Sequence, residues 1–396
     1  MWKGLFLALS ALAASADAFA QGADPLGGAF GAIEAAMSPV EALQQAEMLS
    51  SNLNALAAQR PGVVDTYVLS VSLWNDPVFE NEAREASVIL ARHFDAGDRT
   101  LVLSAGKGGG PRAYPAATPN NIQAALGKIG RTINPLEDLV VVFMTSHGAP
   151  DGAMAIQEAG RMGGRLRPEH LRASLAAAGI RTKVVIISAC FSGHFIVPFS
   201  DPNTVVLTAA AADKTSFGCE PSRDWTYFGD ALFNNALRGG SGLVSAYDES
   251  LGLIAKWEAD LLAQYEALPA SRKAGERRPE PSNPQKHVGE AVADLLAKVE
   301  PFGRAVSCAG NLSVAFDRAR AGRPLKGLAD VQRIQAARSD LEARAVQLAS
   351  AVNKTPQDVA RAISASSAAL LVVAGKQSEQ LAAHADKCLS FNPTAG

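Results

Sequence analysis

The chain has 396 residues, which is enough for two or three ordinary domains with a sizeable core. Its 37 Lys and Arg residues and 39 Asp and Glu residues leave a formal net charge of −2. There is no sustained basic stripe, so no nucleic-acid partner is expected. Many Ala and Gly residues and only 6% aromatic residues are typical of an α/β protein with alanine-rich helices.

Residues 1–20, MWKGLFLALSALAASADAFA, are predicted to be a signal peptide. Lys3 precedes an apolar segment at 5–14, and 18–20 form a small-x-small site with cleavage expected after Ala20. We therefore expect a periplasmic or secreted protein, with an uncleaved N-terminal anchor as the alternative. No later apolar run approaches the ~18 residues that a membrane span needs, so no span is expected after signal removal.

Residues 21–61 are interpreted as a glycine-rich lead-in followed by an N-terminal helix. Ser38 is the expected N-cap of that helix, Pro39 its first residue and Glu41 the partner in a capping box.

Residues 62–268 alternate between strand and helix patterns and are interpreted as one domain. Apolar, β-branched runs predict strands at 66–74, 100–105, 138–148, 183–190 and 204–211. Helices are predicted at about 79–94, 119–130 and 167–179. Such strands predict a mostly parallel sheet that helices cover on both faces. Residues 269–288 are interpreted as a polar linker and 289–396 as a C-terminal helical region.

Two of the predicted strands end at residues that can carry chemistry. The third ends in TSHG at His147 and Gly148, and the fourth ends in KVVIISAC at Cys190. The carboxyl ends of parallel strands are where ligands usually bind. A cysteine is nucleophilic as its thiolate and needs a nearby base, for which histidine is the usual choice. The N–H groups of Gly148 and Cys190 would form a two-donor oxyanion hole.

Other interpretations of these residues stay open at this point. His147 alone reads as a structural histidine, Cys190 alone reads as a core thiol, and His194 is an alternative base. No Cys-x-x-Cys or His-Glu-x-x-His spacing occurs, so a metal site is not expected. No cofactor is expected either.

The chain has four cysteines, Cys190, Cys219, Cys308 and Cys388. They permit three full pairings, and the sequence does not choose among them. If one cysteine is a working nucleophile, it must stay unpaired. The simplest arrangement then joins Cys308 to Cys388 and leaves Cys219 as a buried free thiol.

Taken together, the segments AQRPGVVDTYVLSVS, TSHGAPDG, VVIISACFSG and DKTSFGCEPSRDWTYFGDALF resemble bacterial exported members of the legumain (asparaginyl endopeptidase) family. The resemblance spans about residues 57–240. It implies a caspase-like three-layer α/β/α sandwich and a cysteine endopeptidase acting on peptides or proteins. In that family His147 would be the general base and acid and Cys190 the nucleophile. The Gly148 and Cys190 amides would form the oxyanion hole.

The resemblance also implies a specificity pocket. Ser216 and Asp230 match positions that line it, and Asn75 is a candidate to orient His147. The family's Arg-His pair after the first strand is missing, and Phe191 replaces an acidic residue. Asparagine specificity is therefore in doubt, and Asp230 with Glu80 would favour a basic residue instead.

Three alternatives accompany this hypothesis. A transpeptidase or transamidase would use the same acyl-enzyme, and a vestigial site would make the protein a binding protein. A thiol-type α/β-hydrolase would need His287 or His384 as its base. Legumains carry a cleavable helical prodomain, so residues 289–396 are a candidate inhibitory cap. The sequence gives no indication of the oligomeric state.

Overall fold

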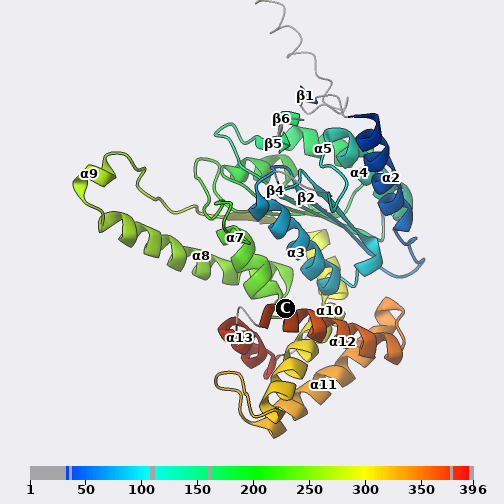
Figure 1. The fold of residues 1–396 in the computed structure, drawn as a ribbon. Helices are drawn as coiled ribbons and strands as arrows, with labels where there is room; N and C mark the ends of the chain where they lie inside the picture. The colour runs from blue at the N-terminus through cyan, green and yellow to red at the C-terminus, as the bar shows by residue number, and fades with distance from the viewer. Residues whose placement is uncertain (1–32, 35–37, 108–111, 159–161, 375–377, 392–396) are drawn as a thin grey trace, which may run out of the picture.

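The computed structural model describes residues 33–34, 38–107, 112–158, 162–374 and 378–391 (Figure 1). The predicted signal peptide, residues 1–20, lies outside the described residues. Within the described part of the chain, no helix is both long and apolar enough to cross a membrane. The predicted N-terminal helix is confirmed as α2 (Pro39–Ala55), which begins at the expected Ser38–Glu41 capping box.

A six-stranded sheet forms the centre of the molecule, in the order β3-β2-β4-β7-β8-β9. Neighbouring strands from β3 to β8 pair in parallel, and only β9 is antiparallel to its neighbour β8. The strands are β2 (Thr66–Ser72), β3 (Thr100–Ser104), β4 (Leu139–Thr145), β7 (Lys183–Ser188), β8 (Thr204–Thr208) and β9 (Gln285–Val288). The first five lie within the ranges that the apolar runs predict.

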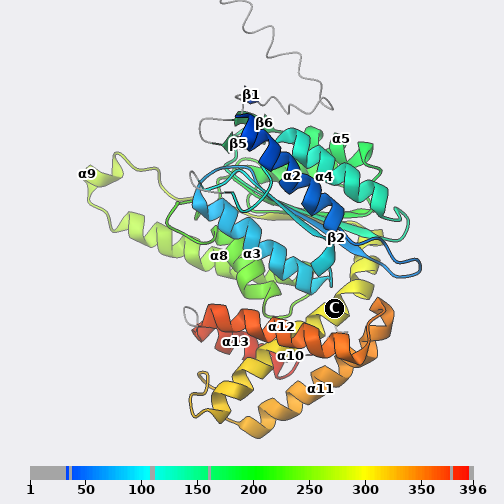
Figure 2. The same ribbon diagram turned by 45° about the vertical axis from the view of Figure 1, so that its right-hand side comes forward.

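Helices cover both faces of this sheet, which confirms the predicted three-layer α/β/α sandwich (Figures 1 and 2). Alternate residues of β2 point to opposite faces, as the two-residue period of a strand requires. Tyr67, Leu69 and Val71 pack in one core with α4 (Pro119–Thr132) and α5 (Pro168–Ala177). Val68 packs in the other core with α3 (Pro77–His93), the π-helical segment η3 (Asp230–Leu237) and α8 (Leu243–Glu266).

A second, smaller antiparallel sheet was not predicted from the sequence. Its order is β1-β6-β5, with β1 (Ile33–Glu34), β5 (Met154–Glu158) and β6 (Met162–Leu166). The Ala155 N–H donates to the His147 carbonyl at 2.8 Å, and the Gln157 N–H donates to the Leu73 carbonyl at 2.8 Å. The hairpin therefore supports the segment that carries His147. Short helical segments complete this half of the chain: η1 (Gly97–Arg99), η2 (Ser192–Phe195), α6 (Ile196–Phe199), α7 (Tyr227–Gly229) and α9 (Ala270–Lys273).

The C-terminal region is helical, as predicted, but its boundary differs from the prediction. It contains α10 (Glu290–Arg320), α11 (Val331–Ala349), η4 (Ser350–Val352), α12 (Pro356–Ala374) and α13 (Ser378–Cys388). The predicted linker 269–288 ends in β9, which completes the sheet. Helix α10 then serves both parts. Val292 and Leu296 belong to the core of the sandwich, whereas Phe302 and Leu312 belong to the core of the helical region.

Two contacts fix α10 against the sandwich. A Cβ atom on Gly303 would lie 2.0 Å from the carbonyl oxygen of His93, so only glycine allows this approach to the end of α3. The buried His93 side chain contacts Glu300, with 3.1 Å between Nε2 and Oε1. Within the helical region a disulfide joins Cys308 to Cys388, while Cys190 and Cys219 are free thiols.

Candidate active site

The ends of β4 and β7 bring His147 and Cys190 to one edge of the sheet. Thr145 and Ser188 are paired residues in the parallel register of these strands. Beyond them, the Ser146 N–H donates to the Ser188 carbonyl at 3.1 Å, which extends the pairing by one residue. His147 follows Ser146 directly after β4, and Cys190 comes two residues after Ser188, the last residue of β7. The two side chains therefore leave the sheet from adjacent strands.

Gly148 lies directly against the backbone of Cys190. A Cβ atom at this glycine would lie 1.9 Å from the Cys190 carbonyl oxygen and 2.8 Å from its carbonyl carbon. These are backbone atoms that cannot turn aside, so a side chain at position 148 requires the two loops to separate. The glycine after His147 is thus a condition for the two chain segments to meet.

The chain turns sharply just after Cys190. Phe191 adopts a left-handed backbone conformation with φ of 59°, which is uncommon for a bulky residue. Its N–H donates to the Lys214 carbonyl at 2.7 Å, and this bond holds the turn. Backbone strain of this kind concentrates at functional sites. Here it leaves the Cys190 thiol half-buried at the end of the strand.

Ser216 lies beside the Cys190 sulfur. Its backbone N–H donates to Sγ at 3.3 Å, and its hydroxyl lies 3.7 Å from the same atom. The sulfur also lies 3.7 Å from the Ser216 carbonyl oxygen, to which the thiol can donate. The structure therefore brings the predicted residues Ser216 and Cys190 together.

The His147 ring is held by three side chains from the start of α3 and the residues before it. Trp74 and Phe79 each meet it edge-on, with ring centroids 5.0 Å apart. The Asp76 carboxylate lies 3.6 Å from His147 Nε2, and both side chains are about one-third exposed. Nε2 is therefore the ring nitrogen that faces the carboxylate.

Asp76 is the residue that sequence reasoning missed. Asn75 was the candidate to orient His147, but the structure gives the contact to its neighbour. Asp76 is the N-cap of α3, yet its side chain makes no capping hydrogen bond and is directed at His147 instead. The available signal was an acidic residue immediately before the Pro77 that opens this helix.

The two acidic residues proposed to favour a basic substrate are occupied within the protein. The Asp230 carboxylate accepts from the side-chain amides of Asn234 at 2.8 Å and Asn235 at 3.1 Å, and burial raises the pKa of Asp230. The Glu80 carboxylate accepts from the Ser104 hydroxyl at 2.7 Å and lies 3.6 Å from Lys107 Nζ. No hydrogen bond between described residues joins Asp230 to Cys190 or Ser216. Both carboxylates therefore already have partners within the protein, which removes the support for a basic substrate preference.

The alternative histidines have other partners. His194 packs on Gly152, and its Nε2 lies 3.2 Å from the Pro150 carbonyl oxygen. His287 lies on β9, with Nε2 3.1 Å from the Asp201 carbonyl oxygen. His384 is buried in α13, where burial first and the positive charge of Arg238 next lower its pKa to about 3. None of these contacts reaches Cys190, so an α/β-hydrolase arrangement lacks its base.

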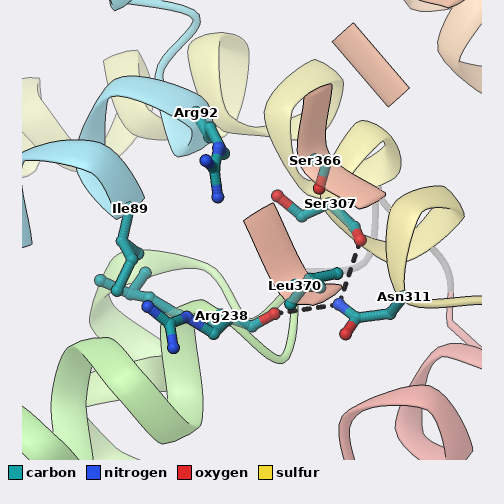
Figure 3. Close-up of a pocket in the computed structure, with 8 residues that line it drawn as sticks. Ile89, Arg92, Arg238, Ser307, Asn311, Ser366 and Leu370 are labelled. Carbon is teal, nitrogen blue, oxygen red and sulfur yellow. Dashed lines mark hydrogen bonds between the residues drawn. The ribbon is translucent and has the colours of Figure 1, made fainter. Parts of the chain in front are cut away.

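A separate pocket lies between the sandwich and the C-terminal helices (Figure 3). It measures about 290 Å³ including its open mouth, and α3, η3, α10 and α12 contribute its walls. The lining residues are Ile89, Arg92, Leu237, Arg238, Ser307, Asn311, Ser366 and Leu370. It opens near the C-terminal end of α3, whereas Asp76 and His147 lie at the N-terminal end. In the part of the chain that the structure describes, no three His, Cys, Asp or Glu side chains form a group that could hold a metal ion.

Comparisons with known proteins give one family match and one match to a solved structure. Residues 119–243 match the Peptidase C13 family, and the matched segment includes β4, β7, His147 and Cys190. Among solved structures, caspase-1 from Spodoptera frugiperda is similar at 12% identity, covering 60% of this chain and 89% of that chain with a TM-score of 0.39. No curated protein matches the chain.

The matched family indicates the general class of protein. It is a family of cysteine-type peptidases, so this chain is a cysteine-type peptidase and its substrate is a protein or peptide. More narrowly, the chain is legumain-like, as its motifs predicted.

Proposed function

We propose that the protein is an exported cysteine endopeptidase in which Cys190 is the nucleophile and His147 is the general base and acid. The observation that carries the proposal is the contact between Gly148 and the Cys190 backbone, because it places the two strand ends side by side. The Ser216 N–H at the sulfur and the Asp76 carboxylate at the imidazole support the same roles.

Acylation begins when His147 takes the proton of the Cys190 thiol. The sulfur then bonds to the carbonyl carbon of the scissile peptide, and the N–H groups of Gly148 and Cys190 stabilise the resulting oxyanion. As the carbon–nitrogen bond breaks, His147 gives its proton to the leaving amine, and a thioester remains on Cys190. Asp76 stabilises the imidazolium in between, as a carboxylate beside a catalytic histidine does.

Deacylation repeats these steps with water. His147 removes a proton from water, and the oxygen bonds to the thioester carbonyl carbon. The carbon–sulfur bond then breaks, which releases a carboxylic acid, and the proton on His147 returns to the sulfur. Each turnover therefore consumes one water and one peptide bond, with no other reactant.

Export is supported by the signal-peptide pattern at residues 1–20 and by the Cys308–Cys388 disulfide. Structural disulfides persist in oxidising compartments such as the periplasm and the cell exterior. N-terminal sequencing of the protein recovered from the periplasm or the medium is expected to begin at Gln21. Recovery in the cytosol with Met1 intact would overturn this part of the proposal.

The activity is tested with a diverse peptide library and mass spectrometry of the products. Wild-type protein lacking residues 1–20 and its His194→Ala variant are expected to cleave internal peptide bonds. Cys190→Ala and His147→Ala are expected to leave the library intact. Cleavage that survives Cys190→Ala, or no cleavage by the wild type, would contradict the proposal. Ligated products formed with an added peptide amine would identify transfer in place of hydrolysis.

A further inference from the structure

A carboxyl group without a charged partner lies beneath the candidate active site. Glu82, on α3, has no exposed surface. Its Oε2 accepts a hydrogen bond from the Thr145 hydroxyl. Its Oε1 accepts from the Thr226 hydroxyl at 2.5 Å and lies 3.4 Å from the Ser188 hydroxyl oxygen. These partners come from β4, from the start of α7 and from β7.

Two of the partners stand at equivalent places before the proposed catalytic residues. Thr145 is two residues before His147, and Ser188 is two residues before Cys190. Thr145 and Ser188 are also paired in the sheet, so the carboxyl group bridges the last pair of residues before the two strands separate. The carboxyl group therefore links the end of β4 to the end of β7 through side chains, in addition to the backbone hydrogen bonds between the two strands.

Glu82 also connects this pair to the helix that holds the His147 ring. Helix α3 begins beside Asp76, and Phe79, one turn before Glu82, contacts the ring. A shift of α3 relative to β7 would therefore move the side chains that contact the His147 ring relative to Cys190. The hydrogen bonds of Glu82 oppose that shift.

Burying the Glu82 carboxyl group costs free energy, and the groups that surround it reduce this cost. Burial raises the pKa of Glu82 to about 7, and hydrogen bonds from Thr145, Thr226 and Ser188 oppose the rise. The Thr226 backbone also hydrogen-bonds the carboxyl group, and none of the groups that influence it in the described chain is a charged side chain. A Cβ atom on Gly229 would lie 1.8 Å from Oε1, so the end of α7 also makes room for the carboxyl group. A purely structural core position is filled at less cost by an apolar side chain.

We propose that Glu82 is a positioning residue of the peptidase site. Its carboxyl group fixes the spacing between the strand end that carries His147 and the strand end that carries Cys190. It does not touch the substrate. This inference rests on the proposed function, because it gives Glu82 its effect through the Cys190–His147 pair.

The test compares Glu82→Gln with the wild type. Glutamine keeps the volume but replaces one acceptor oxygen with an amide donor, so at least one hydroxyl loses its acceptor. We expect kcat for peptide cleavage to fall by about tenfold or more while KM stays within about twofold. Glu82→Ala removes every hydrogen bond that the carboxyl group accepts, and we expect it to lower kcat by about 100-fold or more where it folds.

A second readout does not depend on peptide cleavage. Alkylation of Cys190 by iodoacetamide, followed by mass spectrometry across about pH 5 to 9, reports the thiolate that His147 supports. We expect the midpoint of this profile to move in Glu82→Gln, because the imidazole and the sulfur are no longer held at their native spacing. The matched control is Glu258→Gln. Glu258, on α8, is another buried carboxyl group whose pKa is raised by burial, and it accepts a hydrogen bond from the Ser282 N–H at 3.1 Å. This control is expected to leave kcat and the alkylation profile unchanged.

The outcomes separate the two proposals. If the wild type cleaves peptides and Glu82→Gln keeps its kcat and alkylation midpoint, the role of Glu82 is overturned and the proposed function stands. A fall in kcat that matches the unfolded fraction from thermal melting, with an unchanged midpoint, also overturns it. If the wild type cleaves nothing, the proposed function fails, and the alkylation profile still reports whether Glu82 couples the two strand ends.

Discussion

At the residue scale, Gly148 has two roles. Its missing side chain lets the His147 loop touch Cys190, and its N–H is the proposed donor to the oxyanion. Gly148→Ala is therefore expected to lower kcat by about 100-fold or more, the usual cost of losing one such donor. Gly252→Ala is the matched control, because a Cβ atom there meets nothing within 4 Å. Peptidase assays at equal folded concentration compare the two. Equal activity in both variants would contradict the contact that defines the site.

The buried carboxyl group of Glu82 also makes stability depend on pH. Its pKa is about 7 in the folded protein and 4.5 in an unperturbed chain, so the folded state holds the proton more tightly. Its stabilising contribution is complete below about pH 4.5 and is lost as pH rises through about 7. Relative to Glu82→Gln, the free energy of unfolding of the wild type should fall by about 3 kcal/mol over that range. Urea titrations at a series of pH values measure this difference, and parallel curves for the two proteins would rule it out.

At the scale of elements, the disulfide ties the two ends of the helical region. Cys308 on α10 and Cys388 on α13 are 80 residues apart in sequence. Closing a loop of that length restricts the unfolded chain, so Cys308→Ala with Cys388→Ala should lower the free energy of unfolding by about 4 kcal/mol. The kcat of the folded variant should stay within about twofold, because no contact of this disulfide reaches the strand ends. Denaturant unfolding with and without reductant measures the effect, and equal midpoints would contradict it.

The elements that the sequence predicted share a strong local signal. Continuous apolar runs gave β2, β4, β7 and β8, and Ser38 with Glu41 marked the start of α2. Because parallel strands end at one edge, the same runs placed His147 and Cys190 together. These signals lie within single stretches of the chain and need no knowledge of distant residues.

The elements that were missed depend on tertiary contacts. The β5–β6 hairpin is short, and β6 contains adjacent glycines, so no alternating apolar pattern marks it. Strand β9 is a polar segment that forms a strand only because β8 offers an open edge. The role of Glu82 could not be predicted from the sequence for a related reason. Its hydroxyl partners lie 63, 106 and 144 residues away in sequence.

At the scale of the whole molecule, the described C-terminal helices contact the sandwich away from the candidate active site. Helix α10 meets α3 at His93, whereas the candidate site lies at Asp76, the opposite end of this helix. The 17 residues of α3 separate these points by roughly 25 Å. The structure therefore does not support the hypothesis that residues 289–396 cover the catalytic pair.

This architecture predicts the result of cutting the exposed segment between α9 and β9. Trypsin cleavage after Arg277 should leave two fragments that elute together in size-exclusion chromatography. The C-terminal fragment supplies β9 to the sheet and Val292 and Leu296 to the sandwich core, and the disulfide lies wholly within it. Peptidase activity should persist in the nicked protein. Separate elution of the two fragments without denaturant would contradict a shared core.

In the proposed mechanism, His147 activates Cys190 as a nucleophile. Its most direct test is the intact mass, with peptide mapping, of protein treated with a peptide-based electrophile that alkylates catalytic thiols. One adduct, on Cys190, is expected in the wild type and in His194→Ala, and none in His147→Ala over the same time. An adduct on Cys219, or equal labelling of Cys190 after His147→Ala, would contradict it.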